Sequence, residues 1–286
     1  MDFLRPANLA EALSAKAAQP AAVPIAGGTD VMVELNFDRR RPPALLDLTR
    51  VDELAQWDTD GPYLRIGAGV TYRRVIDELG ERLPGLAMAA RTVGSPQIRN
   101  RGTVGGNLGS ASPAGDAHPP LLAGHALVEL ASVRGSRQVP VEEFFTGPKR
   151  SVLAPDELIA AFLVAPADGP QQFAKVGTRN AMVIAVCSFA VALHPGRRSV
   201  GTGIGSAAPT PLRAGDAERF LGAELPWESR GALPESTARH FGDLVAAAAA
   251  PIDDVRGTAD YRRRALSVLA RRTLTWAWAA YGRRRN

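Results

Sequence analysis

Two pairs of adjacent glycines, Gly27-Gly28 and Gly105-Gly106, constrain the folding of this 286-residue chain more than any other feature. Each pair follows a short apolar or β-branched run and is flanked by hydroxyl or amide side chains. Adjacent glycines let the backbone adopt positive φ and approach a ligand closely, so successive N–H groups can face one concavity. One such pair is typical of an ordinary turn. Two pairs about half a domain apart can converge on the two phosphates of a dinucleotide, so we predict a cofactor-binding site.

The first glycine segment, residues 25–31, lies between a predicted strand at 23–26 and a predicted helical turn at 30–35 that Thr29 can cap. This arrangement gathers N–H groups at the positive end of a helix, which suits phosphate. The second glycine segment, residues 103–107, repeats the pattern. The side-chain amide of Asn107 can bond a phosphate or cap the next turn. Neither segment is a P-loop, because the chain lacks Gly-Lys-Ser/Thr. The predicted ligands are Ile25, Ala26, Gly27, Gly28, Thr29, Asp30, Val31, Thr103, Gly105, Gly106 and Asn107.

The remaining pattern predicts short strands and helices in separate runs. Helices are expected at residues 8–17, 71–83, 86–93, 216–221, 237–250 and 260–281, and strands at 44–48, 64–70, 126–130, 157–164, 173–176, 183–193 and 199–206. A cluster of Pro, Asp and Gly at 166–170 predicts a boundary between domains 1–168 and 169–286. This order favours an α+β fold over a doubly wound parallel sheet.

The net charge of +5 comes almost wholly from arginine, with runs at 262–264, 271–272 and 283–285. Nucleic-acid binding is one interpretation, but it would favour exposed aromatic residues along a basic groove. Leu266, Leu269, Leu274 and Trp278 instead recur at roughly helical spacing. We therefore predict an amphipathic closing helix with solvent-facing arginines, and no nucleic-acid partner.

A single cysteine, Cys187, excludes an internal disulfide framework and any four-cysteine zinc or iron–sulfur site on this chain. It fits a reducing, cytoplasmic setting. The first residues lack the basic region and apolar run of a signal peptide, and no apolar stretch is long enough to span a bilayer. We expect a cytoplasmic protein without a membrane span.

Two other patterns favour simpler interpretations than a binding site. Residues 203–208 satisfy GxGxxA, but Pro209 and Pro211 follow at once and prevent a helix, so a strand ending in a turn is favoured. Asp116, His118 and His125 form a poor zinc signature, and no metal site is predicted. No Ser/His/Asp or Cys/His arrangement is apparent, so no catalytic residue is assigned.

Two charged residues are further candidates for the site. Asp116 lies a few residues beyond the second glycine segment and could accept a hydrogen bond from a ribose or ribityl hydroxyl. Lys175 stands alone in an apolar strand. Such a lysine can stabilise an anionic reduced flavin ring, or it can simply extend its amine to solvent from a strand end.

The motifs, taken in order, resemble those of one known family over nearly the whole chain. They are residues 26–30, 94–100, 103–107, 111–116, 175–181, 208–213 and 261–263. The chain is identified by this resemblance as similar to the FAD-binding medium subunit of the molybdenum hydroxylases, the xanthine dehydrogenase and carbon monoxide dehydrogenase flavoprotein family.

The resemblance implies a two-lobed FAD-binding domain of the vanillyl-alcohol-oxidase (PCMH) type, with lobes of about 1–56 and 57–168, followed by a smaller domain of antiparallel sheet and helices. The first glycine segment would wrap the diphosphate and flavin, and Thr103, Gly106 and Asn107 would contribute from the second lobe. Asp116 would bond the cofactor. Leu158 and Ile159 would pack on the flavin or adenine, and Lys175 would reach the flavin ring.

The resemblance also implies partners. A small subunit with [2Fe–2S] clusters and a large subunit with molybdopterin would complete the enzyme, as a dimer of heterotrimers. Substrate would be oxidised at molybdenum, and electrons would pass through the clusters to FAD and on to a terminal acceptor. The alternative is a flavin-free scaffold or interaction subunit on the same fold. That alternative would favour broken glycine segments, and both are intact here.

Overall fold

The computed structural model describes residues 1–283, so Arg284 and Arg285 of the predicted basic run lie outside the described residues. The first part of the chain forms a three-stranded parallel sheet in the order β1-β3-β2. Its strands are β1 (Asp2–Leu4), β2 (Val23–Ile25) and β3 (Ala44–Asp47). Helix α1 (Leu9–Ala18) is capped by Asn8, whose side chain accepts from the Glu11 N–H, as predicted. Helix α2 (Val31–Asn36) follows β2 and buries none of its residues.

A five-stranded antiparallel sheet follows, in the order β4-β5-β10-β6-β7. The strands are β4 (Trp57–Asp60), β5 (Tyr63–Gly67), β6 (Leu127–Ser132), β7 (Gly135–Pro140) and β10 (Leu158–Val164), and every residue of β10 is buried. Leu64, Leu130 and Phe162 of this sheet share one core with helical residues. The helices are α3 (Tyr72–Glu78), α4 (Pro84–Thr92), α5 (Pro96–Arg101), α6 (Val104–Ser110), α7 (His118–Ala123) and α8 (Val141–Phe144), and a small hairpin comprises β8 (Phe145–Gly147) and β9 (Arg150–Ser151).

The two sheets share a second core. Leu158 and Ala160 of β10 pack with Ala12 of α1 and Leu46 of β3. A short 3₁₀ helix, η1 (Asp52–Ala55), connects the two sheets along the chain. The central strand β10 therefore contributes to the core on each side of its sheet.

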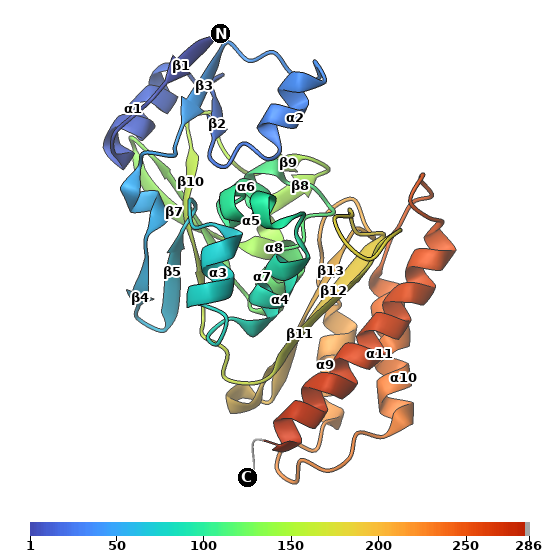
Figure 1. The fold of residues 1–286 in the computed structure, drawn as a ribbon. Helices are drawn as coiled ribbons and strands as arrows, with labels where there is room; N and C mark the ends of the chain where they lie inside the picture. The colour runs from blue at the N-terminus through green and yellow to red at the C-terminus, as the bar shows by residue number, and fades with distance from the viewer. Residues whose placement is uncertain (284–286) are drawn as a thin grey trace.

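The last part of the chain is an antiparallel sheet, β11 (Gln171–Val176), β12 (Cys187–His194) and β13 (Ser199–Gly205), with the 3₁₀ helix η2 (Pro195–Arg197) between the last two strands. Helices α9 (Gly215–Glu224), α10 (Glu235–Ala248) and α11 (Ala259–Arg283) cover its outer face (Figure 1). The predicted strand at 183–193 begins only at Cys187, and residues 177–186 form a loop instead. The α+β fold is confirmed, since the parallel sheet has only three strands.

The other face of this sheet packs on α4 and α7 of the N-terminal part, as Figure 1 shows. Gly201 and Gly203 make this contact possible, because a Cβ at either would overlap the carbonyl oxygen of Ala123 or Pro119. Helix α11 buries Leu266, Leu274 and Trp278, as the amphipathic pattern predicted, and Leu269 is half-buried. The prediction that its arginines face solvent is wrong for Arg262, which is buried, donates to the Ser206 carbonyl oxygen and pairs with Asp254. Within the described residues, no helix combines the length and apolar character that crossing a membrane requires.

Candidate cofactor-binding site

The structure brings the two glycine segments together. A Cβ at Gly27 would overlap the carbonyl oxygen of Arg101, so the first segment lies directly against the junction of α5 and α6. On the same side, Thr29 Oγ1 is 3.4 Å from the position that a Cβ on Gly102 would occupy. Gly27 is therefore a close-approach glycine, and no larger residue fits at this contact.

The first glycine segment presents unpaired backbone donors. The N–H groups of Gly28, Thr29 and Asp30 have no acceptor among residues 1–283. Gly28 has φ +75°, which turns the chain between β2 and α2. The predicted cap by Thr29 is wrong: Asp30 precedes α2 with helical dihedrals, and no side chain caps the helix. The donors are consequently free to bind a ligand.

The second glycine segment differs from the predicted turn. Gly105 and Gly106 lie in the first turn of α6 without positive φ, because Thr103 caps this helix by accepting the Gly106 N–H at 2.9 Å. Gly105 is needed for space, since a Cβ there would overlap Ala68. A Cβ at Gly106 would approach only Thr103 Oγ1, at 3.0 Å. Gly106 thus leaves one side of the α6 N-terminus uncovered.

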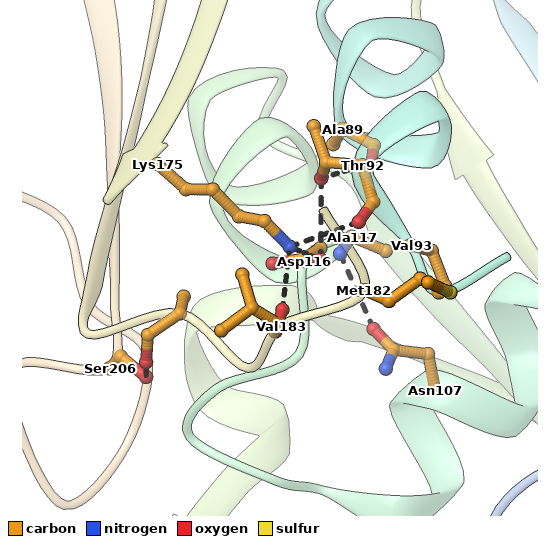
Figure 2. Close-up of polar contacts among 12 residues, drawn as sticks. Ala89, Thr92, Val93, Asn107, Asp116, Ala117, Lys175, Met182, Val183 and Ser206 are labelled. Atoms are coloured by element: carbon orange, nitrogen blue, oxygen red, sulfur yellow. Dashed lines mark hydrogen bonds and ion pairs between the residues drawn. The ribbon is translucent and has the colours of Figure 1, made fainter. Parts of the chain in front are cut away.

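Asn107 holds the loop that carries Asp116. Its Oδ1 accepts from the Ala117 N–H at 3.3 Å (Figure 2), and its carbonyl oxygen lies 3.1 Å from Nε2 of His118. Ala111 ends α6 in the left-handed region, with φ 45°, and turns the chain back toward α7. These contacts fix residues 111–117 against the second glycine segment.

Asp116 and Lys175 form a buried ion pair. Lys175 Nζ is 2.6 Å from Asp116 Oδ2, and the two side chains are only 9% and 10% exposed. The ammonium also donates to the carbonyl oxygens of Thr92 at 3.1 Å and Val183 at 3.2 Å, as Figure 2 shows. An ammonium has three donors, so this set of acceptors engages all of them. Lys175 therefore does not extend to solvent.

Burial raises the pKa of Asp116, while Lys175 and the Thr92 hydroxyl oppose that rise. One oxygen of this carboxylate, Oδ1, is buried and has no hydrogen-bond partner within the described part of the chain. Buried polar atoms without partners are rare in folded proteins and call for an explanation. A ligand hydroxyl or N–H at this point would supply one.

Tyr72, which sequence reasoning missed, carries a second buried atom of this kind. It opens α3 after the cap residue Thr71, and its N–H donates to the Gly102 carbonyl at 3.0 Å. Its hydroxyl is buried and has no partner among residues 1–283. The local signal in the sequence was an aromatic residue directly after a helix cap.

Leu158 and Ile159 are both buried in β10, but they face different cores. Leu158 packs toward α1 and β3, whereas Ile159 belongs to the core beneath the helices. Ile159 Cδ1 would lie 3.6 Å from a Cβ on Gly109 in α6. Of the two, Ile159 therefore lies on the side of the second glycine segment.

The other candidate patterns of the sequence have structural explanations. Within residues 1–283, no group of three or more His, Cys, Asp or Glu side chains could hold a metal ion. His118 is fully buried against Phe145, with ring centroids 4.6 Å apart, and burial lowers its pKa to about 4. The GxGxxA pattern forms the end of β13, as predicted. Burial raises the pKa of the Cys187 thiol to about 12, which makes it inert.

The residues present therefore fit a bound dinucleotide. The first glycine segment has free backbone N–H donors, Gly106 leaves the start of α6 uncovered, and the buried atoms Asp116 Oδ1 and the Tyr72 hydroxyl have no hydrogen-bond partners among residues 1–283.

Comparison with known proteins also indicates a dinucleotide-binding chain. Residues 1–166 match the family described as "FAD binding domain in molybdopterin dehydrogenase", and residues 172–277 match "CO dehydrogenase flavoprotein C-terminal domain".

Individual relatives are similar along the whole chain. The xanthine dehydrogenase FAD-binding subunit of Escherichia coli O157:H7 is 34% identical, over 98% of this chain and 97% of its own length. The nicotine 6-hydroxylase medium subunit of Paenarthrobacter nicotinovorans is 31% identical, over 97% of each chain. Carbon monoxide dehydrogenase from Hydrogenophaga pseudoflava contains a structurally similar chain, with a TM-score of 0.90, 28% identity and 98% coverage of both. The protein therefore belongs to the family of FAD-binding medium subunits of the molybdenum hydroxylases, and it is a subunit of an oxidoreductase.

Proposed function

We propose that this chain is the electron-transfer subunit of such an enzyme, accepting electrons from [2Fe–2S] clusters on a partner subunit and passing them to a terminal acceptor. The observation that carries the proposal is the meeting of two glycine segments beside a buried ion pair and two unpartnered polar atoms. When bound, FAD supplies the redox chemistry, because a flavin can take up electrons singly and release them in pairs.

The first glycine segment would hold the diphosphate through the free N–H groups of Gly28, Thr29 and Asp30. Ile25, Ala26, Gly27 and Val31 would shape that turn. Thr103, Gly105, Gly106 and Asn107 would form the opposite wall, where Gly106 leaves room for the ligand. Ile159 would pack beneath this wall, and Leu158 would support it from the other face of β10.

Asp116 would accept a hydrogen bond from a cofactor hydroxyl at Oδ1, while Lys175 keeps the other oxygen occupied. Because the three donors of Lys175 are already engaged, we propose that it acts through its buried positive charge and by orienting Asp116. That charge would stabilise negative charge on a bound ring system.

We further propose partners that carry the clusters and the molybdopterin, in a dimer of heterotrimers. Several relatives are named as medium chains or as subunits of complexes. The single cysteine is buried and provides no ligand set for a cluster on this chain. A lone reduced thiol also supports a cytoplasmic location. No nucleic-acid partner is proposed.

The experiment is the visible absorption spectrum of the purified full chain, recorded before and after adding FAD and removing the excess by gel filtration. We expect a flavin spectrum at one FAD per chain. Gly106→Val is the matched variant: its side chain would enter the open side of α6, so it should fold yet retain much less FAD. A folded, colourless wild-type chain that takes up no FAD would contradict the proposal and support a flavin-free scaffold.

A further inference from the structure

We propose that the Tyr72 hydroxyl binds a sugar-type hydroxyl of the dinucleotide; this inference rests on the proposed FAD-carrying function. A sugar-type hydroxyl can come from the ribityl chain of the flavin half or from the ribose of the adenosine half. Both are neutral groups that donate and accept hydrogen bonds.

The position of Tyr72 supports this role. Its N–H donates to the Gly102 carbonyl, and its ring lies 3.5 Å from where a Cβ on Gly102 would be. Gly102 joins α5 to α6 and is also the residue beside which Thr29 of the first glycine segment lies. The Tyr72 ring therefore lies where the first and second glycine segments meet, and these two segments would enclose the cofactor.

The Tyr72 side chain is only 3% exposed, and its hydroxyl finds no hydrogen-bond partner among residues 1–283. Leaving a buried hydroxyl unpaired is unfavourable compared with leaving it in water. If the hydroxyl served packing alone, phenylalanine would fill the same space without that cost. The hydroxyl is therefore explained by a partner that arrives with the ligand.

The charges around Tyr72 indicate what that partner is. Burial, with the carboxylates of Asp116 and Asp30 as smaller contributions, raises the pKa of Tyr72 well above its ordinary value. The hydroxyl therefore keeps its proton and can donate. A phosphate would add negative charge to a region whose electrostatics already include the carboxylates of Asp116 and Asp30, whereas a neutral sugar hydroxyl can accept from Tyr72 without that repulsion. A sugar hydroxyl would therefore supply the partner that the Tyr72 hydroxyl lacks.

The test is Tyr72→Phe in the full chain, with Tyr63→Phe as the matched control. Tyr63 is half-buried at the start of β5 and lies outside the site. FAD affinity is measured by quenching of flavin fluorescence. We expect Tyr72→Phe to weaken FAD binding about 2-fold to about 10-fold, the effect of one lost hydrogen bond. The control should bind FAD like the wild type.

Thermal unfolding of the FAD-free proteins provides the second readout. Because the substitution removes an unpaired buried hydroxyl, FAD-free Tyr72→Phe should be as stable as the wild type or more stable, while its gain in stability from added FAD should be smaller. A marked loss of stability without FAD would show a structural role and overturn the inference. Equal FAD affinity in wild type and Tyr72→Phe would overturn it while leaving the proposed function intact.

Two smaller ligands identify the half of the cofactor. Weaker binding of FMN by Tyr72→Phe, with unchanged binding of ADP, would assign the ribityl chain, and the reverse result would assign the ribose. If both smaller ligands bound the variant as they bind the wild type, the sugar assignment would be wrong. A wild-type chain that binds none of the three ligands would instead contradict the proposed function itself.

Discussion

Lys175 Nζ lies 2.6 Å from Asp116 Oδ2, across the contact between the C-terminal sheet and the N-terminal part of the chain. Lys175 belongs to β11, whereas Asp116 lies in the loop between α6 and α7. The pair therefore fixes the loop behind the second glycine segment to a strand 59 residues away in the chain. A buried pair contributes little net stability, but removing one partner leaves an uncompensated buried charge.

The first prediction concerns that charge. Lys175→Met should lower the free energy of unfolding by about 3–5 kcal/mol, because Asp116 would remain buried without its cation. The double variant Lys175→Met/Asp116→Asn should recover a large part of the loss. Urea unfolding of the two single variants and the double variant measures the coupling. Strictly additive losses would show that the two side chains are not energetically paired.

The second prediction is the pH dependence of the Lys175→Met defect. Burial raises the pKa of Asp116, and Lys175 opposes this effect, so the variant should have a still higher pKa at this carboxyl. A carboxyl whose pKa is raised by folding binds its proton more tightly in the folded state. Its contribution to stability is therefore largest below its unfolded pKa and is lost as the pH rises through its folded pKa.

The destabilisation by Lys175→Met should consequently be largest near neutral pH and should shrink as Asp116 becomes protonated. Unfolding of wild type and variant at about pH 5 and about pH 8 checks this trend. Lys149→Met is the control, since Lys149 forms an exposed pair with Glu34 on the surface. A Lys175→Met defect that grows on acidification would contradict the assignment.

The third prediction concerns His118, which is buried and neutral. Burial lowers its pKa from 6.5 to about 4. The folded state therefore binds this proton less tightly, and the corresponding stability is present above pH 6.5 and is lost as the pH falls toward 4. A shift of that size corresponds to about 3 kcal/mol.

In His118→Gln, the free energy of unfolding should fall less steeply than in the wild type as the pH decreases over this interval. The glutamine amide keeps a donor for the Asn107 carbonyl. The remaining slope should reflect His125, whose pKa burial also lowers to about 4. Thermal or urea unfolding between about pH 4 and about pH 7 measures the difference. An unaltered slope in His118→Gln would show that this histidine does not titrate on unfolding.

The fourth prediction separates two neighbouring glycines. Gly105→Ala should cost about 2–4 kcal/mol of stability or prevent folding, because its methyl group would overlap Ala68. Gly106→Ala should change stability by less than about 1 kcal/mol, since alanine favours a helix and only the Thr103 hydroxyl is near. Equal effects on unfolding would show that the tight packing at Gly105 is relieved by small backbone shifts.

Much of the local structure follows from the sequence, because its signals act over a few residues. Asn8 and Thr71 cap their helices as their side-chain chemistry predicts. The apolar spacing in α11 selects its buried face, and the proline after residue 208 prevents a helix at the GxGxxA pattern. The ordered motifs also determined the family. The second glycine segment was predicted to be a turn, but it forms the start of α6. The reason is that the Thr103 side chain caps this helix by accepting the Gly106 N–H.

What the sequence by itself determined is therefore many of the longer helices and strands, the two glycine segments and the family, whereas it did not predict β4, β7, α5, α6 or α7. Only the tertiary structure decided how distant groups meet. The pairing of Lys175 with Asp116 depends on packing β11 to β13 against α4 and α7, which requires Gly201 and Gly203 to admit α7 closely. The burial of Tyr72 likewise depends on the contact of α3 with the α5–α6 junction. Such contacts join residues far apart in the chain, and no local pattern of side chains encodes their distance.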